Sequence, residues 1–172
     1  MEPSETFLRL QPFCIAACKE RNVDSLKALN NAIDQIQDDE TLQRLQDYVL
    51  YPLKLILKLR DQRNASGRGK ETGPPTTNMP KEKKVELALR CLRAVLKRTT
   101  VDSTVTAVQL LTMLFSVLGH PKNGGRVDAG LGEDLKEEVI LAVEALIRNC
   151  SDDALEELCT VRGEVGHGRG KC

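Results

Sequence analysis

The sequence predicts an all-α protein built from helical hairpins, and three observations lead to this prediction. Aliphatic residues recur every three or four positions along most of the 172-residue chain, which is the spacing of one helix face. Strict alternation of apolar and polar residues, the mark of a half-buried strand, fails even in the most apolar run. Two Gly-rich segments, near 61–80 and 119–132, separate the helical runs and are expected to be disordered surface loops.

The composition is that of a globular domain with an aliphatic core. Apolar residues make up 41% of the chain and charged residues 29%, a balance too apolar for a disordered protein. Aromatic residues are only 3% and there is no Trp, so Leu, Val, Ala and Ile must fill the core. We expect one domain over residues 4–160, followed by a disordered Gly-rich tail over 161–172.

Two helices are predicted before residue 40. Apolar residues in 4–20 follow a helical face, and Pro12 is expected to delay the start of this helix or bend it. Residues 23–37 repeat apolar side chains at Val23, Leu26, Leu29, Ile33 and Ile36, with Asn22 or Asp24 as the N-cap.

The run LQRLQDYVLYPLKLILKLR at 42–60 carries two apolar stripes and an internal proline, Pro52. Proline lacks the N–H that would bond the carbonyl of Tyr48, at a cost of roughly 3 kcal/mol inside a helix. Because the helical spacing continues on both sides, we predict one long helix from about Asp39 to Arg60, bent at Pro52. Two apolar stripes indicate neighbours on two sides.

Four further helices are predicted: 81–98, 103–118 with Asp102 or Ser103 as cap, 133–149, and a short one starting after Ser151. The run 103–118 has no charge, but its Ser, Thr and Gln residues favour a buried helix over a membrane span. The basic residues of 81–98 and acidic residues such as Glu137 and Glu138 are expected on solvated faces.

These helices are expected to pair in sequence as hairpins: 23–37 with 39–60, 81–98 with 103–118, and 133–149 with 152–159. Without the loop insertions each unit is about 40 residues, the HEAT or armadillo period, so the predicted fold is a short α-solenoid of HEAT/armadillo-like hairpins. A compact helical bundle serving as an adaptor or signalling module is the alternative, because periodicity alone does not exclude it.

No residues are arranged for catalysis, metal binding or cofactor binding. The two histidines, His120 and His167, fall in loops without a paired acid. Cys14 and Cys18 share a helix face, but two ligands do not make a tetrahedral zinc site. The tail GEVGHGRGKC lacks the first glycine and the final Ser or Thr of a phosphate loop. We therefore expect a protein that is not an enzyme and has no cofactor.

The charge balance and the cysteine content limit the partners and the cellular compartment that we expect. Lys plus Arg and Asp plus Glu both number 25, so no basic excess indicates nucleic-acid binding. The six cysteines do not follow a disulfide framework, and no secretory signal is visible. The expected location is cytoplasmic, and also nuclear, with protein partners rather than nucleic acid or membrane.

The segment LQDYVLYPLKLILK at 45–58 resembles the N-terminal region of the Tel-two-interacting protein one family. Its signature places Tyr48, Pro52, Leu53 and Leu57 in the family's order. Upstream, FLRLQPFC and VDSLKALNNAIDQI have the family's spacing; downstream, ALRCLRAVLKRTTV and LKEEVILAVEALI follow in the expected order. The resemblance covers about residues 5–158, and the tail after Cys159 does not look like the family, whose members are several times longer.

The resemblance implies a HEAT-repeat scaffold of the Triple-T co-chaperone complex. Such a scaffold would bind Tel-two and Tti-two subunits. With the heat-shock-ninety chaperone machinery, it would help phosphatidylinositol-3-kinase-related kinases to mature. The last hairpin, 133–158, would expose apolar residues that later repeats normally cover, which predicts self-association or chaperone dependence.

Overall fold

The computed structural model describes residues 3–65, 79–118 and 132–156. These residues form α1 (Pro3–Lys19), α2 (Val23–Asp34), α3 (Asp39–Arg44), α4 (Gln46–Ala65), α5 (Met79–Leu96), α6 (Thr104–Val117) and α7 (Glu133–Arg148). A short helix follows at 152–156. The only β-type pairing among the described residues is an isolated parallel bridge between Val101 and Cys150. The all-α prediction is confirmed.

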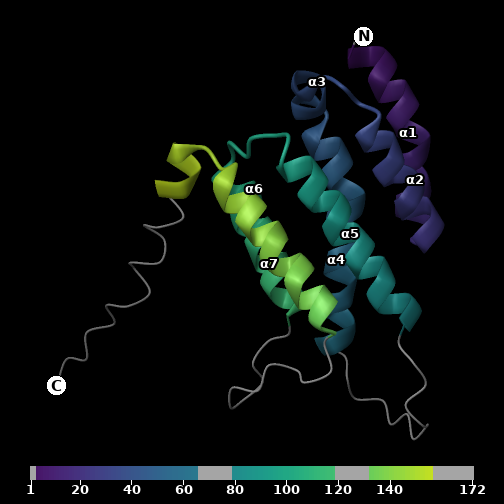
Figure 1. Cartoon of the computed structure of the whole chain (residues 1–172), viewed down its shortest axis with the longest axis vertical. Helices are drawn as coiled ribbons and strands as arrows, with labels where there is room; N and C mark the ends of the chain where they lie inside the picture. The colour runs from purple at the N-terminus through teal and green to yellow at the C-terminus, as the bar shows by residue number, and fades with distance from the viewer. Residues whose placement is uncertain (1–2, 66–78, 119–131, 157–172) are drawn as a thin grey trace, which may run out of the picture.

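The six long helices form two layers of three (Figure 1). One layer, called here the A layer, contains α1, α4 and α6; the other, the B layer, contains α2, α5 and α7. Each A helix packs against the B helix that follows it in the chain, and the chain direction reverses between them (Figure 1). Three hairpins, α1–α2, α4–α5 and α6–α7, therefore stack side by side, as in an α-solenoid.

The predicted solenoid is confirmed, but the predicted pairing of its helices is wrong by one element. We expected 23–37 to pair with 39–60 and 81–98 with 103–118. In the structure α2 packs mainly on α1 and α5, and α5 packs on α4, α2 and α7. The short connections thus carry the chain from one hairpin to the next. The undescribed segments 66–78 and 119–131, which include most of both predicted loops, lie within hairpins.

The predicted long helix over 39–60 is two helices. α3 ends at Arg44, Leu45 has non-helical dihedral angles, and α4 then runs from Gln46 through Pro52 to Ala65. The interruption comes seven residues before the proline, so Pro52 is not its cause. The side chains of Gln43 and Gln46, on either side of the break, both hydrogen-bond to Thr100. The end of α3 and the start of α4 are therefore each held against the turn after α5.

Two other boundaries differ from the prediction. α1 begins at Pro3 and continues through Pro12, so the expected late start is wrong. Residues 61–65 and 79–80, expected in the first loop, belong to α4 and α5. The tail 161–172 and the residues after 156 in the last predicted helix lie outside the described residues, and the prediction of disorder there is untested.

Side-chain caps begin three of the helices in the places the sequence indicated. Asn22 accepts a hydrogen bond from the Ser25 amide at 2.7 Å and starts α2. Ser103 accepts from the Thr106 amide at the start of α6. Ser151 accepts from the Ala154 amide at 3.3 Å and begins the helix at 152–156. Each cap satisfies an amide that has no partner within the helix.

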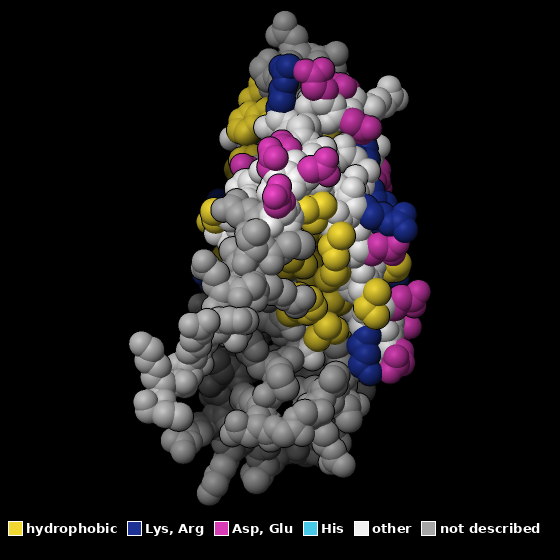
Figure 2. Space-filling model, turned by 90° about the vertical axis from the view of Figure 1, so that its left-hand side faces the viewer, with side chains coloured by type: hydrophobic (Ala, Val, Ile, Leu, Met, Phe, Trp, Pro, Cys, Tyr) yellow, Lys and Arg dark blue, Asp and Glu magenta, His cyan; other side chains and the backbone are white. Residues whose placement is uncertain are grey.

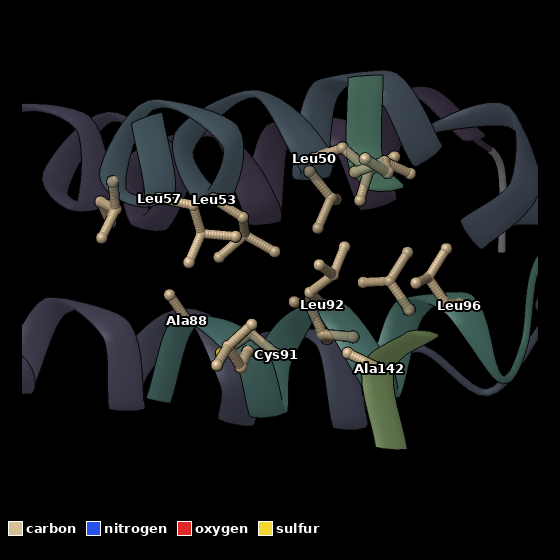
Figure 3. Packing of buried hydrophobic residues seen from close by; sticks show 14 of the residues in the cluster. Leu50, Leu53, Leu57, Ala88, Cys91, Leu92, Leu96 and Ala142 are labelled. Atoms are coloured by element: carbon tan, nitrogen blue, oxygen red, sulfur yellow. The ribbon is translucent and has the colours of Figure 1, made fainter. Parts of the chain in front are cut away.

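The core lies between the two layers and is almost wholly aliphatic. Figure 3 shows Leu50, Leu53 and Leu57 of α4 pointing toward Ala88 and Leu92 of α5, and all five are fully buried. Burying a leucine side chain contributes roughly 1.5–3 kcal/mol, so the contacts between α4 and α5 are strongly stabilising.

Candidate protein-interaction surfaces

The four signature residues of the resemblance lie inside the structure, not on a binding surface. Leu53 and Leu57 are fully buried against α5, and Pro52 is buried. Tyr48 is half-buried, and its ring lies 4.8 Å from that of Phe7 in α1. Desolvation raises the pKa of Tyr48. The signature therefore couples α4 to two of its neighbours, α1 and α5, which accounts for the two apolar stripes.

A polar junction joins α3 and the start of α4 to the turn after α5. The Gln46 amide donates to Thr99 Oγ1 at 2.7 Å, and the Gln43 amide donates to the Thr100 carbonyl at 2.8 Å. The Thr100 amide in turn donates to Gln43 Oε1 at 2.6 Å. These bonds satisfy the polar backbone of the turn after α5, which would otherwise cost free energy where it is buried. The sequence analysis missed this junction because its partners are more than 50 residues apart.

Arg98 forms a second connection at the same end of the molecule. Its guanidinium donates to the carbonyls of Ile33 and Ile36 at the C-terminus of α2, and to Asp39 Oδ1 at 2.6 Å. Carbonyls at a helix C-terminus lack helical partners and carry partial negative charge, so an arginine there is stabilising. Arg98 had been expected on the solvated side of its helix.

Glu138 contradicts its predicted place on a solvated face. Its side chain is only 10% exposed, between α7 and α5. Oε1 accepts a hydrogen bond from Arg90 Nε at 3.0 Å, and Oε2 lies 3.5 Å from an Arg93 nitrogen. Two arginines on α5 thus neutralise one carboxylate on α7. Some basic residues of 81–98 therefore form ion pairs between α5 and α7 instead of facing only solvent.

Exposed hydrophobic side chains gather on the A layer. Large hydrophobic side chains are exposed on all three A helices, but among the described side chains of the B helices only on α7. We call the following set the A-layer surface: Leu8, Ile15, Tyr51, Val105, Val108 and Phe115. Tyr51 is 62% exposed, and an aromatic ring with a polar tip is a common anchor of protein interfaces. Among the residues of α2 and α5 whose side chains the structure describes, no large hydrophobic side chain is exposed.

A second apolar surface lies exposed at one end of the stack. Figure 2 looks at the end formed by α6 and α7 and shows a hydrophobic patch bordered by charged side chains. On α7 it includes Ile140, which is 63% exposed, Ile147, which is 49% exposed, and half-buried Val143. Their spacing of three and four places them in one stripe, called here the α7 stripe. The expected exposure of apolar residues on the last hairpin is confirmed for α7.

The described residues contain no group of three or more His, Cys, Asp or Glu side chains placed to hold a metal ion. Cys14, Cys18, Cys91 and Cys150 are free thiols. Burial raises the pKa of Cys14 and of Cys91 to about 12, so neither is a ready thiolate. His120 and His167 lie outside the described residues. No helix in the described ranges combines the length and apolarity needed to cross a bilayer.

Comparisons with known proteins agree with this architecture. A family model described as "TTI1 N-terminal TPR domain" matches residues 7–167. The match continues past residue 158, where our sequence-based resemblance stopped, so the expectation that the tail after Cys159 differs from the family is wrong as far as residue 167. TPR and HEAT repeats are both stacked helical hairpins.

Two curated relatives match most of the chain. TELO2-interacting protein 1 homolog from Mus musculus is 28% identical over 153 residues, and the Homo sapiens protein of the same name is 26% identical over 153. Each alignment covers 89% of this chain but 12% of the relative, so the chain spans about an eighth of their length. No solved structure gives a significant match. The helical stack, its buried signature and the match over residues 7–167 place this chain in the TTI1 N-terminal TPR domain family.

Proposed function

We propose that this chain is a non-catalytic scaffold module that binds a TELO2-type protein through its A-layer surface. A helical-repeat scaffold is what its family and fold support, and the printed name of its relatives describes them as interacting with TELO2. The observation that carries the proposal is the exposure of large hydrophobic side chains on all three A helices, α1, α4 and α6. Single exposed apolar residues are common, but their recurrence on every helix of one layer favours a docking surface.

The wider role follows from the same resemblance. The module would contribute to an assembly with Tel-two and Tti-two subunits and the heat-shock-ninety machinery, and so to the maturation of phosphatidylinositol-3-kinase-related kinases. Such an assembly would work in the cytoplasm and the nucleus. Free thiols at all four described cysteines are consistent with a reducing compartment.

Binding of the purified chain to purified TELO2 by biolayer interferometry tests the proposal. Tyr51→Ala removes the most exposed aromatic side chain of the A-layer surface, and we expect affinity to fall about tenfold, as for an interface anchor. Lys27→Ala, on the exposed polar face of α2, is the matched control and should leave affinity unchanged. Equal binding by wild type and Tyr51→Ala would reject the A-layer surface, and no binding by either would reject the TELO2 partner.

A further inference from the structure

We propose that the α7 stripe is a self-association surface, and that two copies of this chain pair through it about a two-fold axis. This inference goes beyond the proposed function and uses a different face of the molecule. It concerns Ile140, Val143 and Ile147, which are not part of the A-layer surface.

The register of the B helices shows that this stripe occupies a stacking position. Adding 50 to each residue number aligns α5 with α7. In this alignment the buried side chains Leu89, Leu92 and Leu96 of α5 correspond to Val139, Ala142 and Leu146 of α7, which are also buried. The same alignment places Arg90 and Arg93, which contact Glu138 on the next B helix, on Ile140 and Val143. The α7 stripe is therefore the face by which a B helix contacts its neighbour, but here nothing in the described structure covers it.

The chemistry of that face differs from that of α5. On α5 it carries arginines, and the neighbour supplies a carboxylate. On α7 it carries three aliphatic side chains, so its occupant must be apolar at the corresponding positions. A charged helix face of the α5 type would leave unpaired charges against Ile140 and Ile147, which is unfavourable.

A second copy of α7 meets this requirement because the stripe is self-complementary. In an antiparallel pair centred between Val143 and Glu144, Ile140 lies opposite Ile147 of the second copy, and the two Val143 side chains meet. Glu137 then lies within about one helical turn, roughly 5 Å along the axis, of Arg148 of the second copy. Glu137 is exposed. The side chain of Arg148 is 75% exposed and forms an ion pair with Glu144 of its own helix, an exposed pair that contributes little and can exchange for Glu137 of the second copy. A two-fold axis repeats each contact and closes the assembly as a dimer.

The contact between two single helices is small compared with stable dimer interfaces, so the expected dissociation constant is about 10–100 µM.

Sedimentation velocity of the full chain over a concentration series of about 1–500 µM tests the dimer. Wild type should shift from monomer to dimer across this range. Ile140→Glu should raise the dissociation constant by about a hundredfold, because it places two carboxylates in the apolar contact. Leu8→Glu is the matched control: Leu8 is 64% exposed and Ile140 63%, but Leu8 lies on α1. A monomer at every concentration, or equal effects of the two substitutions, would overturn the proposal.

Exchanging charged residues tests the antiparallel orientation of the two α7 helices without changing the α7 stripe. Glu137→Arg places arginine near Arg148 of the second copy and should raise the dissociation constant about threefold or more. The double variant Glu137→Arg with Arg148→Glu should restore the wild-type value, because the pairs re-form with reversed sign. Failure of the double variant to recover would exclude the antiparallel two-fold arrangement. Circular dichroism of each variant shows that the helices remain folded. TELO2 binding of Ile140→Glu, which lies outside the A-layer surface, separates loss of the dimer from loss of the proposed function.

Discussion

At the scale of single residues, the side chains with the largest structural roles are polar ones whose partners are distant in sequence. Arg98 reaches α2 across 62 and 65 residues, and Glu138 meets Arg90 across 48. Hydrogen bonds to charged groups contribute about 1.5–3 kcal/mol, more than an exposed ion pair within one helix. These two residues therefore fix how neighbouring hairpins meet, whereas pairs such as Glu144 and Arg148 add little.

Cysteine reactivity provides a test at this scale. Desolvation raises the pKa of the Cys91 thiol to about 12. Desolvation also raises the pKa of half-buried Cys18, but the positive charge of nearby Arg21 opposes this shift. At pH 8 we expect a maleimide to label Cys18 at least about tenfold faster than Cys91, since the thiolate is the nucleophile. Peptide mass spectrometry over a time course measures both rates in one sample.

The raised pKa of Cys91 also predicts how the stability of the folded chain changes with pH. The thiol of Cys91 stays protonated in the folded chain up to about pH 12, but the unfolded chain releases this proton near the ordinary value of 9.0. Folding is thus unaffected by this thiol below about pH 9 and loses stability as the pH rises from about 9 to 12. Equal labelling of Cys18 and Cys91 in the folded protein would contradict the buried position of Cys91.

At the scale of elements, Pro52 shows that a local rule can be overridden by packing. Helical spacing continues through the proline, and α4 tolerates it because Pro52 and the leucines around it are buried between α1 and α5. The apolar contacts of α4 offset the missing hydrogen bond to the Tyr48 carbonyl. The break at Leu45 is instead where two glutamines hydrogen-bond to the turn after α5.

Pro52→Ala separates these two effects. Alanine restores the amide donor and removes the ring, a gain of roughly 3 kcal/mol in helix stability. It also deletes about two buried methylenes, a loss of roughly 1.6 kcal/mol. We therefore expect the variant to be more stable by about 1 kcal/mol, measured as a higher urea midpoint with an unchanged slope. A large destabilisation would mean that the ring itself is required for packing against α1.

At the scale of the whole molecule, stability depends on which hairpin is disturbed, because each hairpin packs mainly on its neighbours. The middle hairpin α4–α5 contacts both others, and Leu92 lies fully buried at its centre (Figure 3). Leu146 is equally buried but belongs to the terminal hairpin α6–α7. The two leucines thus form a matched pair that differs mainly in position along the stack.

Hydrogen exchange of Leu92→Ala and Leu146→Ala compares a substitution in the middle hairpin with one in the terminal hairpin. Each substitution should cost about 2–5 kcal/mol locally. For Leu92→Ala we expect faster exchange in both α1–α2 and α6–α7, because both lose their common neighbour. For Leu146→Ala the acceleration should be concentrated in α6–α7 and leave α1–α2 protected. The same exchange pattern for both variants would show that the chain unfolds as one unit, as a compact bundle does.

The sequence by itself determined the helices, their caps and the aliphatic core, because these depend on residues three or four positions apart. Asn22 and Ser103 cap amides three residues away, and the spacing around Leu53 and Leu57 predicts burial directly. Only the tertiary structure decided which helices pair, that Glu138 is buried, and that α7 leaves an apolar stripe uncovered. Those features depend on contacts across about 50 residues or more, and short connections are compatible with either pairing of the helices.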